Sequence, residues 1–134
     1  MTRPAVIFII DDDSDDQEFL KEALTEIEPS FQYFTALNGQ EALKKLQTNT
    51  IPVPSLIFLD LNMPRINGRK FLSILKSDSK LNLIPVIIYS TSSAQKDFDD
   101  MKQLGALDYL VKQSDFSILH EKLHKILSSI LTNW

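Results

Sequence analysis

The 134-residue chain contains no cysteine, which excludes disulfide bonds and thiolate metal sites and fits a reducing cytoplasm. It also lacks a basic excess. Lys and Arg total 14 against 18 Asp and Glu, and this net charge of −4 argues against direct binding to nucleic acid. The early apolar run at 5–10 is too short for a signal peptide or a membrane span. We therefore expect one cytoplasmic domain over residues 1–134, with no separate output domain and no membrane segment.

Short apolar runs rich in β-branched and aromatic residues recur along the chain, at 6–10, 56–59, 86–89 and 109–111. Each run is apolar on both faces and too short for a helix. Such runs are typical of parallel strands that are covered on both sides. A fifth run at 31–36 is interrupted by polar residues, so we expect it to form an edge strand.

Amphipathic stretches with helix-start signals separate the runs. The expected capping residues of these helices are Ser14, Asn38, Asn67, Ser93 and Ser114. Gln17 and Glu41 would complete capping boxes with the first two, Pro29 is expected to stop the first helix, and Gly105 to end the fourth. Strand and helix alternate five times, which predicts an α/β fold with an open, doubly wound, five-stranded parallel sheet and five helices.

Polar residues that can carry chemistry follow four of the expected strands. Asp11 and Asp12 follow the first, Asp60 the third, Ser90 stands at the end of the fourth, and Lys112 follows the fifth. In such folds ligands bind beyond the carboxyl ends of the strands. A cluster of carboxylates needs a counter-charge, and its oxygen atoms suit Mg²⁺. A hydroxyl and an ammonium nearby suit a phosphoryl group, for which a carboxylate can be the nucleophile.

Four segments at these strand ends resemble, in order, the motifs of response regulator receiver domains. They are IFIIDDD at 7–13, LDLNMP at 59–64 followed by Gly68, PVIIYST at 85–91, and GA at 105–106 leading to YLVK at 109–112. Each motif alone is weak, but four in this order are highly specific, and the resemblance covers essentially the whole chain. It is to stand-alone regulators of the chemotaxis type, and it implies a flavodoxin-like sheet with strand order 2-1-3-4-5.

The resemblance also implies a role for each of the polar residues at the strand ends. Asp60 would accept a phosphoryl group from a histidine kinase or a histidine phosphotransfer protein. Asp11, Asp12, Asp60 and the backbone carbonyl of Asn62 would hold Mg²⁺, and Lys112 would contact the phosphoryl group. The chain would then be a phosphorylation switch and not an enzyme, apart from its own phosphoryl transfer and autodephosphorylation.

Ser90 and Tyr109 are the switch residues that the resemblance implies. Ser90 would bond a phosphoryl oxygen, and Tyr109 would then turn inward. The face built from the fourth helix, fifth strand and fifth helix would in consequence bind a downstream protein, or a second copy of the chain, in a phosphorylation-dependent way. In the family, the positions of Asn62 and Ser92 tune autodephosphorylation.

Other interpretations of the acidic run and of a histidine motif are weaker. Residues 11–22 imitate an EF-hand loop, but Asp16 stands where that turn needs glycine, and a strand precedes the loop. Asp15 and Asp16 fit the positive end of a helix dipole, whereas the role of Asp13 stays open. The HExxH motif at 120–124 resembles a zinc-protease site, but the ten residues after it contain no His, Asp or Glu as a further ligand.

Two functional alternatives also come from different classes of protein. A phosphatase of the haloacid dehalogenase type would place its nucleophile within Asp11 to Asp13, but it usually carries a cap domain for which there is no room. A pseudo-receiver would bind partners without phosphorylation and would not need the complete set of site residues.

One departure from the family concerns the bond after Lys112. The family commonly has proline next, with a cis bond, whereas this chain has Gln113. A cis bond before a residue other than proline costs about 3 to 4 kcal/mol. We therefore expect the Lys112–Gln113 bond to be trans.

Overall fold

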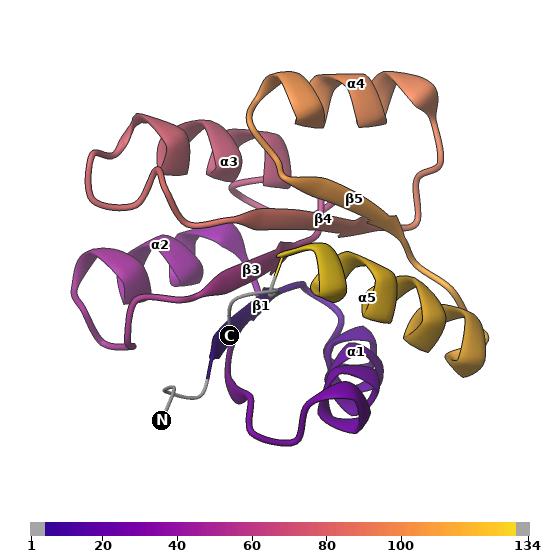
Figure 1. Cartoon of the computed structure of the whole chain (residues 1–134). Coiled ribbons are helices and arrows are strands. Elements are labelled where there is room, and N and C mark those ends of the chain that lie inside the picture. Colours follow the sequence, from indigo (N-terminus) through magenta and orange to yellow (C-terminus); the bar gives the residue numbers. More distant parts are fainter. Residues whose placement is uncertain (1–4, 131–134) are drawn as a thin grey trace.

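The computed structural model describes residues 5–130, in which a parallel sheet lies between two layers of helices (Figure 1). The strands are β1 (Val6–Ile10), β2 (Gln32–Ala36), β3 (Leu56–Leu59), β4 (Val86–Ser90) and β5 (Asp108–Val111). The helices are α1 (Ser14–Ile27), α2 (Gly39–Gln47), α3 (Gly68–Ser77), α4 (Gln95–Gln103) and α5 (Phe116–Ile130). The strand order is β2-β1-β3-β4-β5 and every pairing is parallel, so the expected flavodoxin-like fold, with β2 at an edge, is confirmed.

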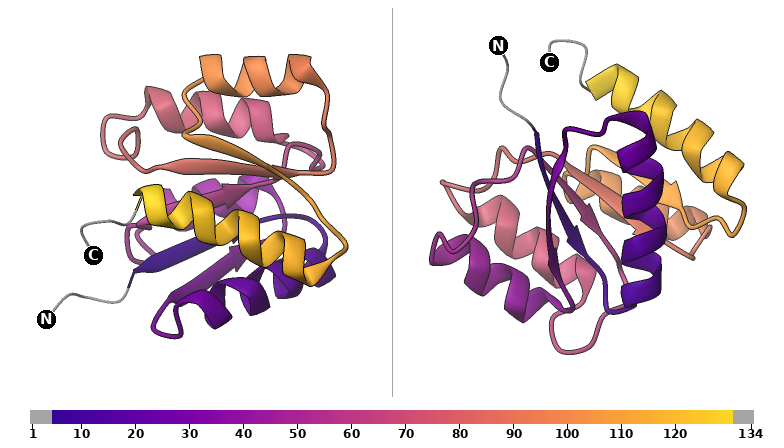
Figure 2. Two further views of the ribbon diagram at one scale, coloured as in Figure 1. Left: turned by 45° about the vertical axis from the view of Figure 1, so that its right-hand side comes forward. Right: turned by 90° about the horizontal axis from the view of Figure 1, so that it is seen from below.

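The sheet separates two apolar cores because its central strands are apolar on both faces. Helices α1 and α5 lie side by side on one face, while α2, α3 and α4 cover the other (Figure 2). In β1, Phe8 and Ile10 belong to the core under α2 and α3, whereas Ile7 and Ile9 belong to the core under α1 and α5. This alternation along a strand gives both helical layers an apolar surface to bury.

Two of the expected helix caps are confirmed. The side chain of Asn38 accepts the N–H of Glu41 at 2.8 Å, and that of Asn67 accepts the N–H of Lys70 at 2.9 Å. Gly105 follows α4 with a φ of 101°, a left-handed conformation that favours glycine.

Three other expected caps are wrong. Asp13, not Ser14, caps α1, and its carboxylate accepts the N–H groups of Asp15 and Asp16 at 2.9 and 3.1 Å. Gln17 forms no capping box because its buried side chain instead donates to the carbonyl oxygens of Asp11 and Ala36. An ionised carboxylate is a better partner than a hydroxyl for the positive end of a helix, which explains the preference for Asp13.

The starts of α4 and α5 also differ from the prediction. Ala94, and not Ser93, occupies the N-cap position of α4, and its side chain offers no acceptor to cap the helix. Asp115, and not Ser114, accepts the N–H of Ile118 at 3.1 Å, so an aspartate again replaces the expected serine.

The bond after Lys112, between β5 and α5, has the expected geometry. No peptide bond within residues 5–130 is cis, so the Lys112–Gln113 bond is trans as predicted. Over the same residues, no helix has both the length and the apolar character needed to cross a membrane.

Candidate functional site

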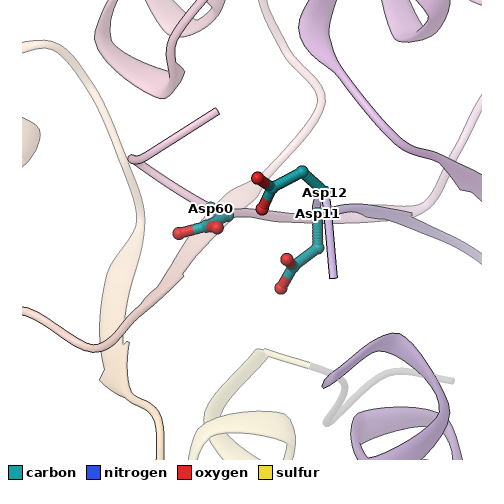
Figure 3. Close-up of side chains that lie close together, drawn as sticks. All are labelled: Asp11, Asp12 and Asp60. Carbon is teal, nitrogen blue, oxygen red and sulfur yellow. The ribbon is translucent and has the colours of Figure 1, made fainter. Parts of the chain in front are cut away.

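Three aspartates from two neighbouring strands meet at the carboxyl edge of the sheet (Figure 3). Asp11 and Asp12 follow β1, and Asp60 follows β3, which pairs with β1. One carboxylate oxygen from each of the three lies within 4.8 Å of the others. Asp11 and Asp60 are only 1% and 5% exposed, whereas Asp12 faces solvent. The parallel strands therefore bring together the three acids that the sequence analysis selected.

Burial makes this carboxylate cluster electrostatically unfavourable. It raises the pKa of Asp11 to about 6, against the lowering effects of a hydrogen bond from the Asp13 N–H and of the nearby Lys112. Burial likewise raises the pKa of Asp60, although Lys112 and a hydrogen bond from the Asn62 N–H favour the ionised form. A cation that binds here would relieve that cost.

The donor set fits a hard divalent cation. Oδ2 of Asp11 is buried and accepts no hydrogen bond from the described residues, although Lys112 Nζ lies 2.9 Å away as an ion-pair partner. Mg²⁺ and Ca²⁺ take oxygen ligands, and Mg²⁺ in particular is held in proteins by one or two carboxylates together with water. Three carboxylates with an incompletely bonded oxygen therefore match such an ion.

Lys112 is the counter-charge that the structure places in this cluster. Its ammonium is 2.9 Å from Asp11 Oδ2, 2.8 Å from Asp16 Oδ2 and 3.6 Å from Asp60 Oδ2, and its side chain is 10% exposed. Burial by itself would lower the pKa of Lys112, but Asp16 and Asp11 outweigh it and raise the pKa above its usual value. The lysine is therefore charged, and it lies nearer to these two acids than to Asp60.

Asp16 is a site residue that the sequence analysis missed. Interpreting Asp16 only as an acid at a helix start was incomplete, because its side chain also pairs with Lys112 across 96 positions of sequence. The signal that could have found it is positional. Helix α1 starts directly behind β1, so its first turn faces the same rim as the strand ends.

The loop after Asp60 closes tightly, and a glycine makes this closure possible. The N–H of Gly68 donates to the carbonyl of Leu61 at 2.9 Å. A Cβ at position 68 would lie 2.4 Å from the Asp60 carbonyl oxygen and 2.7 Å from Leu61 Cα, which is too close for any side chain. Within this loop, the N–H of Asn62 lies 3.4 Å from Asp60 Oδ1. Gly68 thus holds the start of α3 against the backbone of Asp60.

The two expected switch residues meet at the backbone of Ser92. Ser90 is fully buried at the end of β4, and its Oγ accepts the N–H of Ser92 at 3.2 Å. The hydroxyl of Tyr109 donates to the carbonyl of Ser92 at 2.9 Å. The half-buried ring of Tyr109 packs edge-on against Phe98 of α4, with ring centroids 4.4 Å apart. The structure therefore places a hydrogen-bonded path between β4, the β4–α4 loop and β5.

An ion-pair network that sequence reasoning did not find ties this loop to α3. Ser92 Oγ donates to the carboxylate of Asp97 on α4, and Arg69 of α3 pairs with the same carboxylate. Arg69 also lies 3.0 Å from Asp100. The spacing of these residues in the sequence gives no sign that they meet.

The histidine motif does not form a metal site in the described part of the chain. His120 lies 3.9 Å from Glu26 and packs near Phe116, and His124 is exposed. Among residues 5–130, the three aspartates are the group of His, Cys, Asp or Glu side chains close enough to share one ion. The acidic run is likewise no EF-hand loop, because strand β1 and not a helix precedes it.

Comparison with known proteins agrees with this arrangement. Residues 7–124 match the response regulator receiver domain family. Response regulator Rcp1 of Synechocystis is 29% identical over 98% of this chain and 89% of its own length. Chemotaxis protein CheY1 of Helicobacter pylori is 28% identical over 92% of this chain and 97% of its own.

Two solved structures are similar over almost the whole chain. The Mn²⁺-bound form of response regulator Rcp1 has a TM-score of 0.85 at 29% identity and covers 98% of this chain and 97% of its own. The phosphorylated cyanobacterial phytochrome response regulator RcpA has a TM-score of 0.87 at 30% identity, covering 98% and 96%. The chain thus belongs to the response regulator receiver domains of two-component signalling, a family of phosphorylation switches that bind a divalent metal, take a phosphoryl group from histidine kinases and act on downstream targets.

Proposed function

We propose that residues 1–134 form a single receiver domain whose phosphoacceptor is Asp60. The observation that carries this proposal is the environment of the Asp60 carboxylate. It is buried at the end of β3, within reach of two further carboxylates and 3.6 Å from the Lys112 ammonium. That combination suits an acid that must attack an anionic group. As is general for the family, we propose the cytoplasm as its compartment.

The chemistry is a transfer of phosphoryl from histidine to aspartate. A lone pair on a carboxylate oxygen of Asp60 forms the new P–O bond, the P–N bond of the donor phosphohistidine breaks, and its electron pair returns to the imidazole nitrogen. Lys112 stabilises the charge that gathers on the phosphoryl oxygens. When bound, Mg²⁺ held by Asp11, Asp12, Asp60 and the Asn62 carbonyl supplies neutralisation of the remaining negative charge.

The proposed donor is a histidine kinase or a histidine phosphotransfer protein. Hydrolysis of the resulting acyl phosphate resets the switch, and its rate depends on the side chains at Asn62 and Ser92. Asn62 is exposed two residues after Asp60, and Ser92 is half-buried beside Ser90, so both residues lie close to the proposed acceptor or to the switch hydroxyl.

The proposed output is the face formed by α4, β5 and α5. Ser90 Oγ is the hydroxyl that would bond a phosphoryl oxygen, and its partner Ser92 also accepts the hydroxyl of Tyr109 on β5. A change at Ser90 therefore has a short path to Tyr109 and, through its ring contact, to Phe98 of α4. We propose that a downstream protein or a second copy of the chain binds this face when Asp60 is phosphorylated.

Intact-mass measurement after incubation with acetyl phosphate and Mg²⁺ tests the acceptor. We expect the wild type and the control variant Asp15→Asn, which alters an exposed acid of α1, to gain the mass of one phosphoryl group. Asp60→Asn should gain none, and EDTA should prevent labelling of the wild type. Full labelling of Asp60→Asn would remove Asp60 from this role.

NMR shifts on addition of beryllofluoride and Mg²⁺ test the output face. We expect amide resonances of the β4–α4 loop, α4 and β5 to move beyond those of the site itself. Shift changes limited to α1 and α2 would contradict the proposed path.

A further inference from the structure

The Lys112 ammonium has two strong carboxylate partners, and they differ in their access to water. Asp11 and Asp16 lie 2.9 and 2.8 Å from Nζ, whereas Asp60 lies at 3.6 Å, beyond an ordinary hydrogen bond. The side chain of Asp11 is 2% exposed, but that of Asp16 is 38% exposed. The lysine is thus held on the α1 side of the site, away from the proposed phosphoacceptor.

A phosphoryl group on Asp60 would compete for this ammonium. It carries a charge of about −1.5 to −2 and three acceptor oxygens, so it attracts Lys112 more strongly than one carboxylate does. Asp11 is a buried member of the same carboxylate cluster as Asp60, so the ammonium can keep Asp11 as a partner while it approaches the phosphoryl group. Releasing Asp16 costs little, because water can solvate its half-exposed carboxylate. Asp16 is therefore the partner that Lys112 can leave.

We propose that Asp16 is a positioning residue that holds Lys112 back while Asp60 is unmodified, and that Lys112 leaves Asp16 when Asp60 is phosphorylated. This inference rests on the proposed role of Asp60 and deepens it. The start of α1 holds Asp16 in place beside Lys112, because the backbone N–H of Asp16 donates to the capping carboxylate of Asp13 at 3.1 Å. Asp16 thereby opposes phosphorylation and favours the resting state.

The affinity for beryllofluoride in the presence of Mg²⁺ tests this exchange, with each variant titrated by NMR. We expect Asp16→Asn to bind about threefold to tenfold more tightly than the wild type, since a partly exposed ion pair no longer has to be broken. Asp15→Asn removes the same charge from the same exposed turn of α1, and its affinity should change less than about twofold.

A double variant separates partner exchange from plain repulsion between Asp16 and the anion. In a Lys112→Met background, Asp16→Asn should change the affinity no more than Asp15→Asn does. If the full gain from Asp16→Asn persists without the lysine, Asp16 acts by repulsion and the inference is wrong.

The Lys112 side-chain resonances give a second readout that does not require tight binding. In Asp16→Asn without ligand, the ¹³Cε resonance of Lys112 should move part of the way toward its position in the beryllofluoride-bound wild type. An unchanged resonance, or equal or weaker beryllofluoride binding by Asp16→Asn, overturns the inference alone. A wild type that binds no beryllofluoride overturns both the inference and the proposed function.

Discussion

Charged residues are held in opposite ways at the strand-end site and at α4. At the site, burial of Asp11 and Asp60 raises the pKa of both carboxyl groups. At α4, a hydrogen bond from Ser92 and the pairing with Arg69 lower the pKa of Asp97, and these side chains are partly exposed. The site therefore holds charge at a cost that a cation can relieve, whereas the α4 network forms and breaks at little cost.

Packing differs between the same two regions. Helix α1 buries four residues and contacts α5, whose Leu119, Leu123 and Leu127 are buried. Helix α4 buries only Met101 among its residues. A hollow of about 780 Å³ opens beside it, lined in part by Phe98 and Tyr109. The α1–α5 layer behind the site is therefore firmly packed, whereas α4 is held by fewer buried side chains and can move more easily.

The largest expected effect compares a leucine of α5 with the methionine of α4. Leu123 is 0% and Met101 1% exposed, so burial alone predicts similar losses on truncation. We expect Leu123→Ala to lower the free energy of unfolding by about 4 kcal/mol and Met101→Ala by about 2 kcal/mol, because a weakly anchored helix can shift to fill the space. Urea denaturation measures both. Equal losses would show that α4 is packed as firmly as α5.

The next effect concerns the pH dependence of stability without Mg²⁺. Folding raises the pKa of Asp11 from 3.8 to about 6, so the folded state binds this proton more tightly than the unfolded state does. The contribution of Asp11 to stability is therefore most favourable below pH 4 and is lost as the pH rises toward about 6.

Replacement of Asp11 by a residue that does not ionise should remove the loss of stability at neutral pH. We expect Asp11→Asn to raise the free energy of unfolding at pH 7 by about 1 to 3 kcal/mol in EDTA, with a smaller gain at pH 4.5. The exposed Asp12→Asn is the matched control and should change stability by less than about 0.5 kcal/mol. If Asp11→Asn proves less stable than the wild type at pH 7, the strand-end site does not hold its charge at a cost.

The smallest expected effect is the loss of the α3–α4 ion pairs. Arg69→Gln should lower the free energy of unfolding by less than about 1 kcal/mol, because its partners are partly exposed. The same change should shift the NMR resonances of Ser92 and Tyr109, which the network reaches through Asp97. Lys70→Gln, at the exposed neighbouring position, should leave those resonances in place. If these resonances do not move in Arg69→Gln, the α3–α4 ion pairs do not influence the switch residues.

The positions of the strands and the acid cluster could be predicted from local patterns, whereas the strand order came from the resemblance to receiver domains. Apolar runs mark the strands, and strand ends in a parallel sheet meet at one edge, so Asp11, Asp12 and Asp60 had to lie close together. The partner of Lys112 on α1 and the pairing of Arg69 with α4 depend instead on side-chain directions between distant elements, which periodicity does not encode. Two helix starts failed where an aspartate stood beside the predicted serine, as at Asp13, and the third failed because α4 follows Ala94 without a side-chain cap.

The assignment of Asp60 as the phosphoacceptor is tested most directly by locating the phosphoryl group on the chain. Borohydride reduces an acyl phosphate on aspartate to homoserine, so treatment of the phosphorylated protein followed by peptide mass spectrometry marks the acceptor. We expect homoserine in place of Asp60 and nowhere else, with none formed in EDTA. Homoserine in place of Asp11, Asp12 or Asp13 would contradict it and would support a nucleophile at the end of β1, as in the phosphatase alternative.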